Sequence, residues 1–269
     1  MQIAVSGGTG FIGRALVQRL RERGDDVRVL KRGEAAPADV VINLAGASIG
    51  QRWTRERKQR ILDSRVETTR ALVDAHPRVL ISASGIGYYG LHGDEVVDET
   101  AASGRGFLAE VTRDWEAAAH RADAFARVVV FRFGVVLGKG GGALEPMIRA
   151  FRFGAGGPIG DGRQWMSWVD CDDVIRAIEW AIENPAVRGD YNITSPEPVR
   201  NRDFARVLGR VMHRPSVLPA PAFALRLLFG EMAEEVLLGG QRAVPARATR
   251  EGFTFRYATL DESLRHVLG

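Results

Sequence analysis

Mainly apolar runs and predicted helices alternate along the chain up to about residue 193. The apolar runs occupy residues 3–5, 27–30, 40–44, 79–82, 128–133 and 191–193. Helices are predicted over residues 11–23, 54–75, 107–120 and 172–183, the first with Ile12, Leu16, Val17 and Leu20 on one face. Apolar strands of this kind are typical of a parallel sheet covered by helices on both sides. The pattern therefore predicts an α/β fold with a doubly wound parallel sheet.

Residues 4–13, AVSGGTGFIG, join the first predicted strand to the first predicted helix. The spacing is G-x-G-x-x-G from Gly8 and G-x-x-G-x-x-G from Gly7. Such glycines permit a sharp turn, close approach of a diphosphate to the backbone, and tight packing of the helix at Gly13. The amides and the positive dipole end of the helix then face the diphosphate. An incidental glycine-rich turn is the alternative, but the flanking strand and helix favour a Rossmann-type dinucleotide site.

Two cations, Lys31 and Arg32, follow the second predicted strand. An acidic residue at this place usually bonds the ribose 2′-hydroxyl of NAD. Cations instead attract the 2′-phosphate of NADP. The pair therefore predicts NADP(H) as the cofactor, with two solvated turn residues as the alternative.

The link between the second and third predicted strands, residues 33–39, is unusually short. A parallel connection normally needs about a dozen residues or more. Either the linker crosses in an extended form, or the sheet lacks one edge strand. We favour loss of an edge strand, which leaves the adenine side of the cofactor site more open.

The character of the chain changes at about Thr194, where prolines begin to punctuate short helices such as 203–212 and 223–229. We therefore expect a Rossmann domain over residues 1–193 and a smaller, mainly helical substrate lobe over residues 194–269. Residues 143–168 are expected to contribute to the substrate cleft.

Composition changes this picture little. The chain is 45% hydrophobic with a formal net charge of +4. It has no basic stripe interleaved with aromatic residues, so no nucleic-acid partner is expected. It has no apolar span of membrane length, and its single cysteine, Cys171, suits a reducing compartment. We expect a cytoplasmic protein with a small-molecule partner; a homodimer is compatible with the sequence, which leaves the number of subunits open.

Other chemistry is poorly supported by the spacing of the residues. The five histidines show no i,i+4 pair and no neighbouring cysteine, so no metal site is expected. The Gly-x-Ser-x-Gly pattern of a hydrolase is absent around Ser84. Asp170, Asp172 and Asp173 fit the start of a helix, and they disfavour a thiolate at Cys171.

Six motifs cover nearly the whole chain. They are SGGTGFIG at 6–13, VINLAG at 41–46, SASGIGYYG at 82–90, RFGVVLG at 132–138, GGPIGDGRQWMSWVDCDDV at 156–174 and RPSVLPAPAFALRLLFGE at 214–231. Together they resemble the extended short-chain dehydrogenase/reductase superfamily of the epimerase/dehydratase type. More narrowly, they are similar to its atypical SDR39U1-like epimerase branch, with a DUF1731-like C-terminal lobe.

The resemblance implies an NAD(P) site and a set of residues that form it. Those beside the diphosphate are Gly7, Thr9, Gly10, Phe11, Ile12 and Gly13. Those along the adenosine and diphosphate flank are Leu44, Ala45 and Gly46, while Phe133, Gly134 and Val135 approach the nicotinamide and Ser84 is a further contact. The substrate would lie near Trp165, Ser167 and Trp168, where the tryptophans either stack on a sugar or belong to the core.

The catalytic residues of the superfamily are a serine or threonine and a Y-x-x-x-K pair, often with an asparagine. In this chain Ser84 fits the serine position, but Phe107 and Val111 stand where the tyrosine and lysine are expected, and Arg65 takes the asparagine place. Tyr88 and Tyr89 are the nearest other proton donors. The alternative is that both rings only pack the loop, with their hydroxyl groups bonded to the backbone.

These features predict an NADP(H)-dependent oxidoreductase or epimerase acting on a small carbonyl or sugar-like compound. A serine polarising the reacting oxygen and a tyrosine donating a proton would assist a hydride step that belongs to the cofactor. The alternative, from a different class of protein, is a non-catalytic NADP(H)-binding regulator or redox sensor. The missing tyrosine and lysine favour this alternative, whereas the retained serine and the aromatic residues of the cleft favour the enzyme.

Arg32→Ala should weaken NADPH binding about ten- to a hundredfold and leave NADH binding nearly unchanged, because a charge-assisted contact to a phosphate is worth roughly 1.5–3 kcal/mol. Fluorescence titration of both dinucleotides checks this. Equal weakening of the two would contradict the assignment of Arg32 to the 2′-phosphate.

Overall fold

The computed structural model describes residues 1–31 and 33–269 and is built around one six-stranded sheet. All its strand pairs are parallel, in the order β10-β6-β4-β3-β1-β2. The strands are β1 (Gln2–Ser6), β2 (Asp26–Leu30), β3 (Val40–Asn43), β4 (Val79–Gly85), β6 (Arg127–Phe133) and β10 (Gly189–Ile193). Four residues, Val40 to Asn43, form β3, and all are buried because helices cover both faces.

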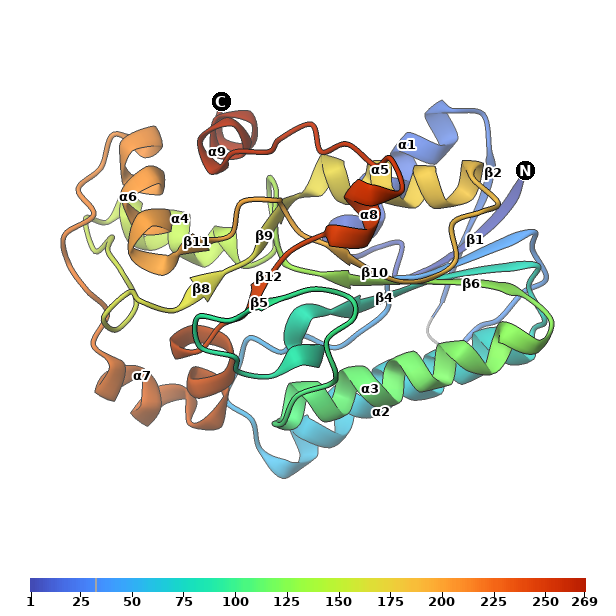
Figure 1. Ribbon diagram of the computed structural model, residues 1–269, viewed down its shortest axis with the longest axis horizontal. Helices are drawn as coiled ribbons and strands as arrows, with labels where there is room; N and C mark the ends of the chain where they lie inside the picture. Colours follow the sequence, from blue (N-terminus) through green and yellow to red (C-terminus); the bar gives the residue numbers. More distant parts are fainter. Residues whose placement is uncertain (32) are drawn as a thin grey trace.

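Two pairs of helices cover the two faces of this sheet (Figure 1). Helices α1 (Phe11–Glu22) and α5 (Cys171–Glu183) pack on one face, and α2 (Arg55–Asp74) and α3 (Phe107–His120) on the other. Side chains alternate along each strand, so Ile81 and Ala83 join the core under α1 and α5 while Leu80 joins the core under α2 and α3. The predicted doubly wound α/β fold is therefore confirmed.

The short link after β2 reflects a strand that is absent from the described part of the chain. β2 is the last strand of the sheet, and β3 lies on the other side of β1. Residues 33–39 pass from the β2 side of β1 to the β3 side without forming a helix or strand. Ala36, within this link, is buried in the core that α2 and α3 cover. Both of the features that we considered are thus present, an extended crossing and a missing edge strand.

The remaining elements are short and lie mostly beyond the carboxyl ends of the strands. Three two-stranded pairs join β7 (Val135–Leu137) to β9 (Trp168–Asp170), β8 (Trp165–Met166) to β11 (Val199–Arg200), and β5 (Val96–Val97) to β12 (Arg242–Ala243). The other helical segments are η1 (Ile86–Tyr89), η2 (Arg121–Ala124), α4 (Leu144–Arg152), α6 (Asn201–Met212), α7 (Ala222–Phe229), η3 (Ala233–Leu238), α8 (Ala246–Arg250) and α9 (Leu260–Leu268).

The C-terminal third does not form one separate body. Helices α4, α6 and α9 share a second core with Trp168. The segment around α8 returns to the main sheet, where Ala248 and Phe253 are part of the core under α1 and α5. The division at residues 193 and 194 remains a prediction.

Gly13→Ala should lower the free energy of unfolding by about 1–3 kcal/mol, because overpacking of a tight contact costs that much. A Cβ at Gly13 would collide with the carbonyl oxygen of Gly7. Gly50 is the control: it is exposed, and the nearest atom to a Cβ there is 3.9 Å away. Urea denaturation should show a change within about 0.5 kcal/mol for Gly50→Ala, and equal losses in the two variants would contradict the tight turn.

Candidate functional site

The carboxyl ends of the six parallel strands share one edge, and most of the predicted cofactor residues lie there. The glycine turn follows β1, Lys31 follows β2, Leu44–Gly46 follow β3, Ser84 is near the end of β4, and Phe133–Val135 close β6. The order of strands reverses at β1, because β2 lies on one side of it and β3 on the other. In open α/β sheets, ligands bind at such a switch point.

The turn before α1 forms a cradle of free amides. Gly7 has a φ of 79°, and a Cβ there would lie 2.6 Å from the carbonyl carbon of Leu44. The amides of Phe11, Ile12 and Gly13 have no hydrogen-bond partner among the described residues. The first turn of α1 carries no acidic residue and Gly10 provides no side-chain cap. These features fit a diphosphate, which free amides and the helix dipole both favour.

The side chains of this motif have packing roles beside the cradle. The ring of Phe11 fills the turn at 138–142, where a Cβ at Gly138 would lie 2.6 Å from its Cζ atom. Ile12 packs against the main core, whereas Thr9 is exposed. Phe11 and Ile12 therefore offer their backbone N–H groups, not their side chains, to a ligand.

The end of β2 carries a carboxylate as well as a cation. Lys31 is exposed, and its amide donates a hydrogen bond to Glu34, 2.8 Å away. Glu34 also pairs with Arg28, and these contacts hold the pKa of the Glu34 carboxyl below its usual range. Arg32, the second predicted contact to a 2′-phosphate, lies outside the described residues.

Two short segments flank the switch point. The amide of Ala45 donates to Asn43 Oδ1 at 3.2 Å, which fixes the chain as it leaves β3. At the end of β6, a Cβ on Gly134 would collide with the carbonyl oxygen of Ser167, and Val135 N donates to that same oxygen at 2.8 Å. The absence of a side chain at Gly134 thus lets β6 approach the strand pair next to it.

Ser84 belongs to a buried ion-pair network. Its hydroxyl donates to Glu116 Oε1 at 2.6 Å, and Glu116 forms a two-point ion pair with Arg132 through Nε at 2.8 Å and Nη2 at 2.7 Å. Ser84, Glu116 and Arg132 are each at most 5% exposed. The sequence predicts that the Ser84 hydroxyl polarises the reacting oxygen. In this arrangement the hydroxyl instead donates its hydrogen to Glu116.

Tyr89 is also part of this network, whereas Tyr88 is not bonded into it. The Tyr89 hydroxyl is fully buried, donates to Asn192 Oδ1 at 2.7 Å and accepts from Arg132 at 3.1 Å. Burial raises the pKa of Tyr89 to about 12. The Tyr88 ring lies 3.6 Å from the Arg132 guanidinium, but its hydroxyl has no hydrogen-bond partner among the described residues.

Arg132 and Glu116 were not among the predicted site residues, although Arg132 contacts the rings of both Tyr88 and Tyr89. The signal was present as an arginine inside an apolar strand. A buried charge of this kind requires a partner, and the carboxylate of Glu116 on the neighbouring helix supplies it.

An apolar cluster surrounds the start of α3, where the superfamily has its tyrosine. Phe107 meets Trp53 edge to face at a centroid distance of 4.9 Å, and Val111 is buried in the same cluster. Glu235 of η3 caps this end of α3 by accepting from the amides of Phe107 and Leu108, both at 2.9 Å. No group that titrates near neutral pH takes the place of the tyrosine at this position.

The residues expected in the substrate cleft are less accessible than the sequence suggested. Trp168 is fully buried, and Ser167 is 1% exposed, where its hydroxyl bonds the backbone of Gln241 and Ala243. Trp165 is partly exposed, but the guanidinium groups of two arginines lie over its ring, at 4.0 and 4.4 Å. The burial of Ser167 and Trp168 does not support direct contact with a substrate, because both side chains are held in the core.

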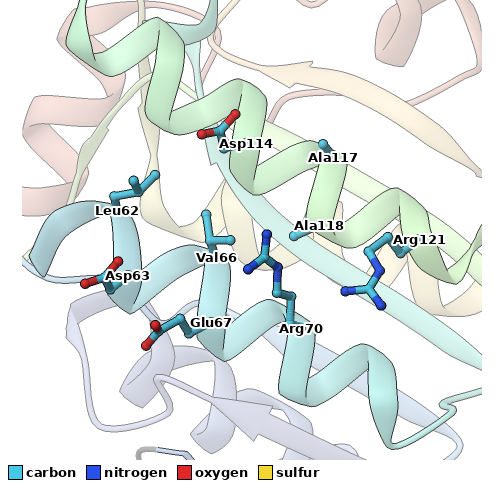
Figure 2. A pocket seen from close by; sticks show the side chains of 9 residues that line it. All are labelled: Leu62, Asp63, Val66, Glu67, Arg70, Asp114, Ala117, Ala118 and Arg121. Atoms are coloured by element: carbon cyan, nitrogen blue, oxygen red, sulfur yellow. The ribbon is translucent and has the colours of Figure 1, made fainter. Parts of the chain in front are cut away.

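A groove of about 390 Å³ runs between α2 and α3, away from these residues (Figure 2). Its walls come from the middle of α2 and the second half of α3, and none of the predicted site residues lines it. Among the described residues no group of three His, Cys, Asp or Glu side chains could hold a metal ion. No helix within the described ranges, residues 1–31 and 33–269, is long and apolar enough to cross a membrane.

Tyr89→Phe should cost about 1–3 kcal/mol of stability, because it leaves Asn192 Oδ1 buried without its donor. Tyr88→Phe removes a hydroxyl with no partner among the described residues and should stay within about 0.5 kcal/mol. Thermal or urea unfolding of the two variants measures the difference. A loss as large for Tyr88→Phe would mean that its hydroxyl is also structural.

Comparison with known proteins places the chain in a family. The sequence profile of the NAD dependent epimerase/dehydratase family matches residues 3–38 and 33–194, and that of a domain of unknown function, DUF1731, matches residues 220–267. The chain is 42% identical to the chloroplastic SDR39U1 homolog of Arabidopsis thaliana, described as an epimerase family protein, over 100% of this chain and 87% of the relative.

Solved structures agree with this assignment. Human epimerase family protein SDR39U1, crystallised with NADPH, aligns with a TM-score of 0.94 and 33% identity over 99% of each chain. A protein described as the nucleoside-diphosphate sugar epimerase of Corynebacterium glutamicum aligns with a TM-score of 0.81 and 34% identity, over 99% of this chain and 58% of that one. The chain therefore belongs to the NAD dependent epimerase/dehydratase family, among the SDR39U1-type epimerase family proteins.

Proposed function

We propose that this protein binds NADP(H) at the carboxyl edge of its sheet and acts as an oxidoreductase or epimerase on a small carbonyl or sugar-like compound. The observation that carries this proposal is the cradle of free amides at the start of α1, located at the switch point of the sheet. Human SDR39U1, which shares the fold over nearly its whole length, was crystallised with NADPH.

The cofactor would extend across the switch point. The amides of residues 11–13 would bind the diphosphate, with Thr9 and Gly10 beside it. Lys31 and Arg32 would bind the 2′-phosphate. Leu44–Gly46 would line the adenosine and diphosphate flank, and Phe133–Val135 would approach the nicotinamide. When bound, the nicotinamide supplies the hydride chemistry, and this chain supplies binding and orientation.

Tyr88 is the best candidate to hold or donate a proton in this site. It lies in η1, directly after β4, and its hydroxyl has no partner among the described residues. Ser84 and Tyr89 would act through the Glu116–Arg132 ion pair as positioning residues, because both are buried and bonded to it. Residues 194–269 would complete the substrate side, since Glu235 from this part of the chain is bound to the start of α3.

A non-catalytic NADP(H)-binding regulator is the second candidate. The apolar cluster around Phe107 and Val111 favours it, because the usual acid, base and lysine are all missing there. A panel of aldehydes, ketones and nucleoside-diphosphate sugars, with NADPH oxidation followed by absorbance, separates the two. Turnover that is lost in Tyr88→Phe would favour the enzyme, and tight NADPH binding without turnover would favour the regulator.

Gly10→Asp tests the cradle without removing the helix. The backbone of Gly10 is extended, with φ −73° and ψ −179°, and aspartate is a preferred N-cap residue, so α1 should remain stable. A carboxylate there would repel the diphosphate. Fluorescence titration should show NADPH bound at least tenfold more weakly by Gly10→Asp than by the matched Gly10→Asn, which has nearly the same shape without the charge. Equal affinities in the two variants would contradict binding of the diphosphate at this turn.

A further inference from the structure

Arg65 on α2 is a largely buried cation without a carboxylate partner among the described residues. Its Nη1 atom donates to the carbonyl oxygens of Ala47 at 3.1 Å and Ile61 at 3.0 Å. Its Nε and Nη2 atoms donate to no group in the described part of the chain. Burial alone lowers the pKa of this guanidinium to about 10. A buried charge that keeps unused donors is costly unless an anion compensates it.

Arg132, a fully buried arginine of the same region, has the opposite environment. Arg132 is bound by the carboxylates of Glu116 and Asp190, at 2.7 and 3.0 Å. The fold can therefore compensate an internal arginine with its own acidic residues, and does so on β6, two strands from β3 in the sheet. Arg65 has no carboxylate of this kind among the described residues, which leaves an anionic ligand as a candidate partner.

The surroundings of Arg65 point to the ligand edge of the sheet. The guanidinium lies against Gly46, directly after β3, where a Cβ would be 2.9 Å from Arg65 Cζ and 3.0 Å from Nη2. The ring of Trp115 on α3 is 5.1 Å away. Trp115 is 6% exposed, and its Nε1 donates to no group in the described residues. The neighbouring side chains of Arg65 and Trp115 thus have donors that no group in the described part of the chain accepts from.

The position of Arg65 along this edge narrows the identity of the ligand. A dinucleotide that spans the switch point has one half on the β2 side of β1 and the other half on the β3 side. Arg65 contacts the end of β3 and Trp115 of α3, and α3 packs over β4 and β6. Gly46, against which the Arg65 guanidinium lies, ends the segment that the proposed function places along the adenosine and diphosphate flank. Arg65 therefore lies where this flank meets the half given to the nicotinamide and the substrate. The carboxamide and ribose of that half of the cofactor carry no negative charge, so an anion on that side belongs to the substrate.

We propose that Arg65 is a substrate-binding residue that holds an anionic oxygen group, a carboxylate or a phosphate, carried by the substrate. This inference rests on the proposed function, because the nicotinamide half of the cofactor defines the adjoining space. It narrows the substrate from a small carbonyl or sugar-like compound to an anionic one. It also assigns the cation of the site to α2, since α3 has Val111 at the lysine position.

The test uses the full chain with NADPH bound and follows cofactor fluorescence as malonate or inorganic phosphate is added at constant ionic strength. Wild-type protein should respond to one of them in a saturable way, and the stronger of the two identifies the group as carboxylate or phosphate. Arg65→Gln should bind that anion at least tenfold more weakly, as expected for loss of a charge-assisted hydrogen bond, while its NADPH affinity changes less than threefold. Arg65→Lys, which keeps the charge, should bind the anion more tightly than Arg65→Gln.

Arg60→Gln is the matched control, because Arg60 is exposed on the same helix and its loss changes the net charge equally. It should leave anion binding unchanged. Thermal unfolding without ligand gives a separate measurement. Loss of an uncompensated cation should leave the melting temperature of Arg65→Gln unchanged or higher by about 2–4 °C, whereas a structural arginine would lower it when removed.

Several results would overturn the proposal. These are the absence of any saturable anion response in wild type, an equal response in Arg65→Gln, or a tenfold loss of NADPH affinity in Arg65→Gln. The last would make Arg65 a cofactor contact. If wild type bound no NADPH, the proposed function would fail, and the anion-dependent thermal shift of the cofactor-free protein would still decide whether Arg65 binds an anion.

Discussion

The contact between the glycine turn and the end of β3 is the constraint on which the ligand edge depends. Gly7 approaches the carbonyl carbon of Leu44 so closely that a side chain there would overlap it, and Gly13 approaches Gly7 in the same way. These contacts hold the turn before α1 against the residues that follow β3, and hold the first turn of α1 against that turn. The amides of that turn have no partner among the described residues, because the residue at the N-cap position, Gly10, has no side chain to accept from them.

The site has two parts, a buried ion-pair network whose polar groups are hydrogen-bonded to one another and a set of groups without hydrogen-bond partners among the described residues. The ion pair of Arg132 with Glu116 binds Ser84 and Tyr89, and in a medium of low dielectric such a satisfied network is rigid. Groups that the described residues leave unbonded lie around it, among them the α1 amides, two of the Arg65 donor atoms, Trp115 Nε1 and the Tyr88 hydroxyl. The fixed network therefore holds β4, α3 and β6 in register beneath the groups that could meet a ligand.

The sequence was informative wherever structure follows from local period or from glycine. The bounds of α3 were predicted to the residue, and the helix predicted over residues 54–75 corresponds to α2 with its N-cap Thr54 and its C-cap Ala75. The short link 33–39 indicated the missing strand. The helices α4 and α9 were not predicted, although Thr259 and Glu262 form a capping box at the start of α9. The hydrogen bond from the Ser84 hydroxyl to Glu116 and the burial of Trp168 could not be predicted from the sequence either, because each depends on partners far away in the chain. The gathering of the predicted site residues at one edge follows from strand order, but the hydrogen bonds of each hydroxyl are set by tertiary contacts.

The missing strand has a consequence for how the molecule avoids self-association. β2 ends the sheet, so in the described structure one row of its backbone groups faces outward as a template for another extended chain. The strand is only five residues long, and the charged side chains of Asp26 and Arg28 are exposed along it. Short length and charge are two ways in which natural sheets keep an open border from recruiting a neighbour. The edge strand β2, which is left at the end of the sheet by the missing strand, is thereby protected against pairing with a strand of another molecule and so against aggregation.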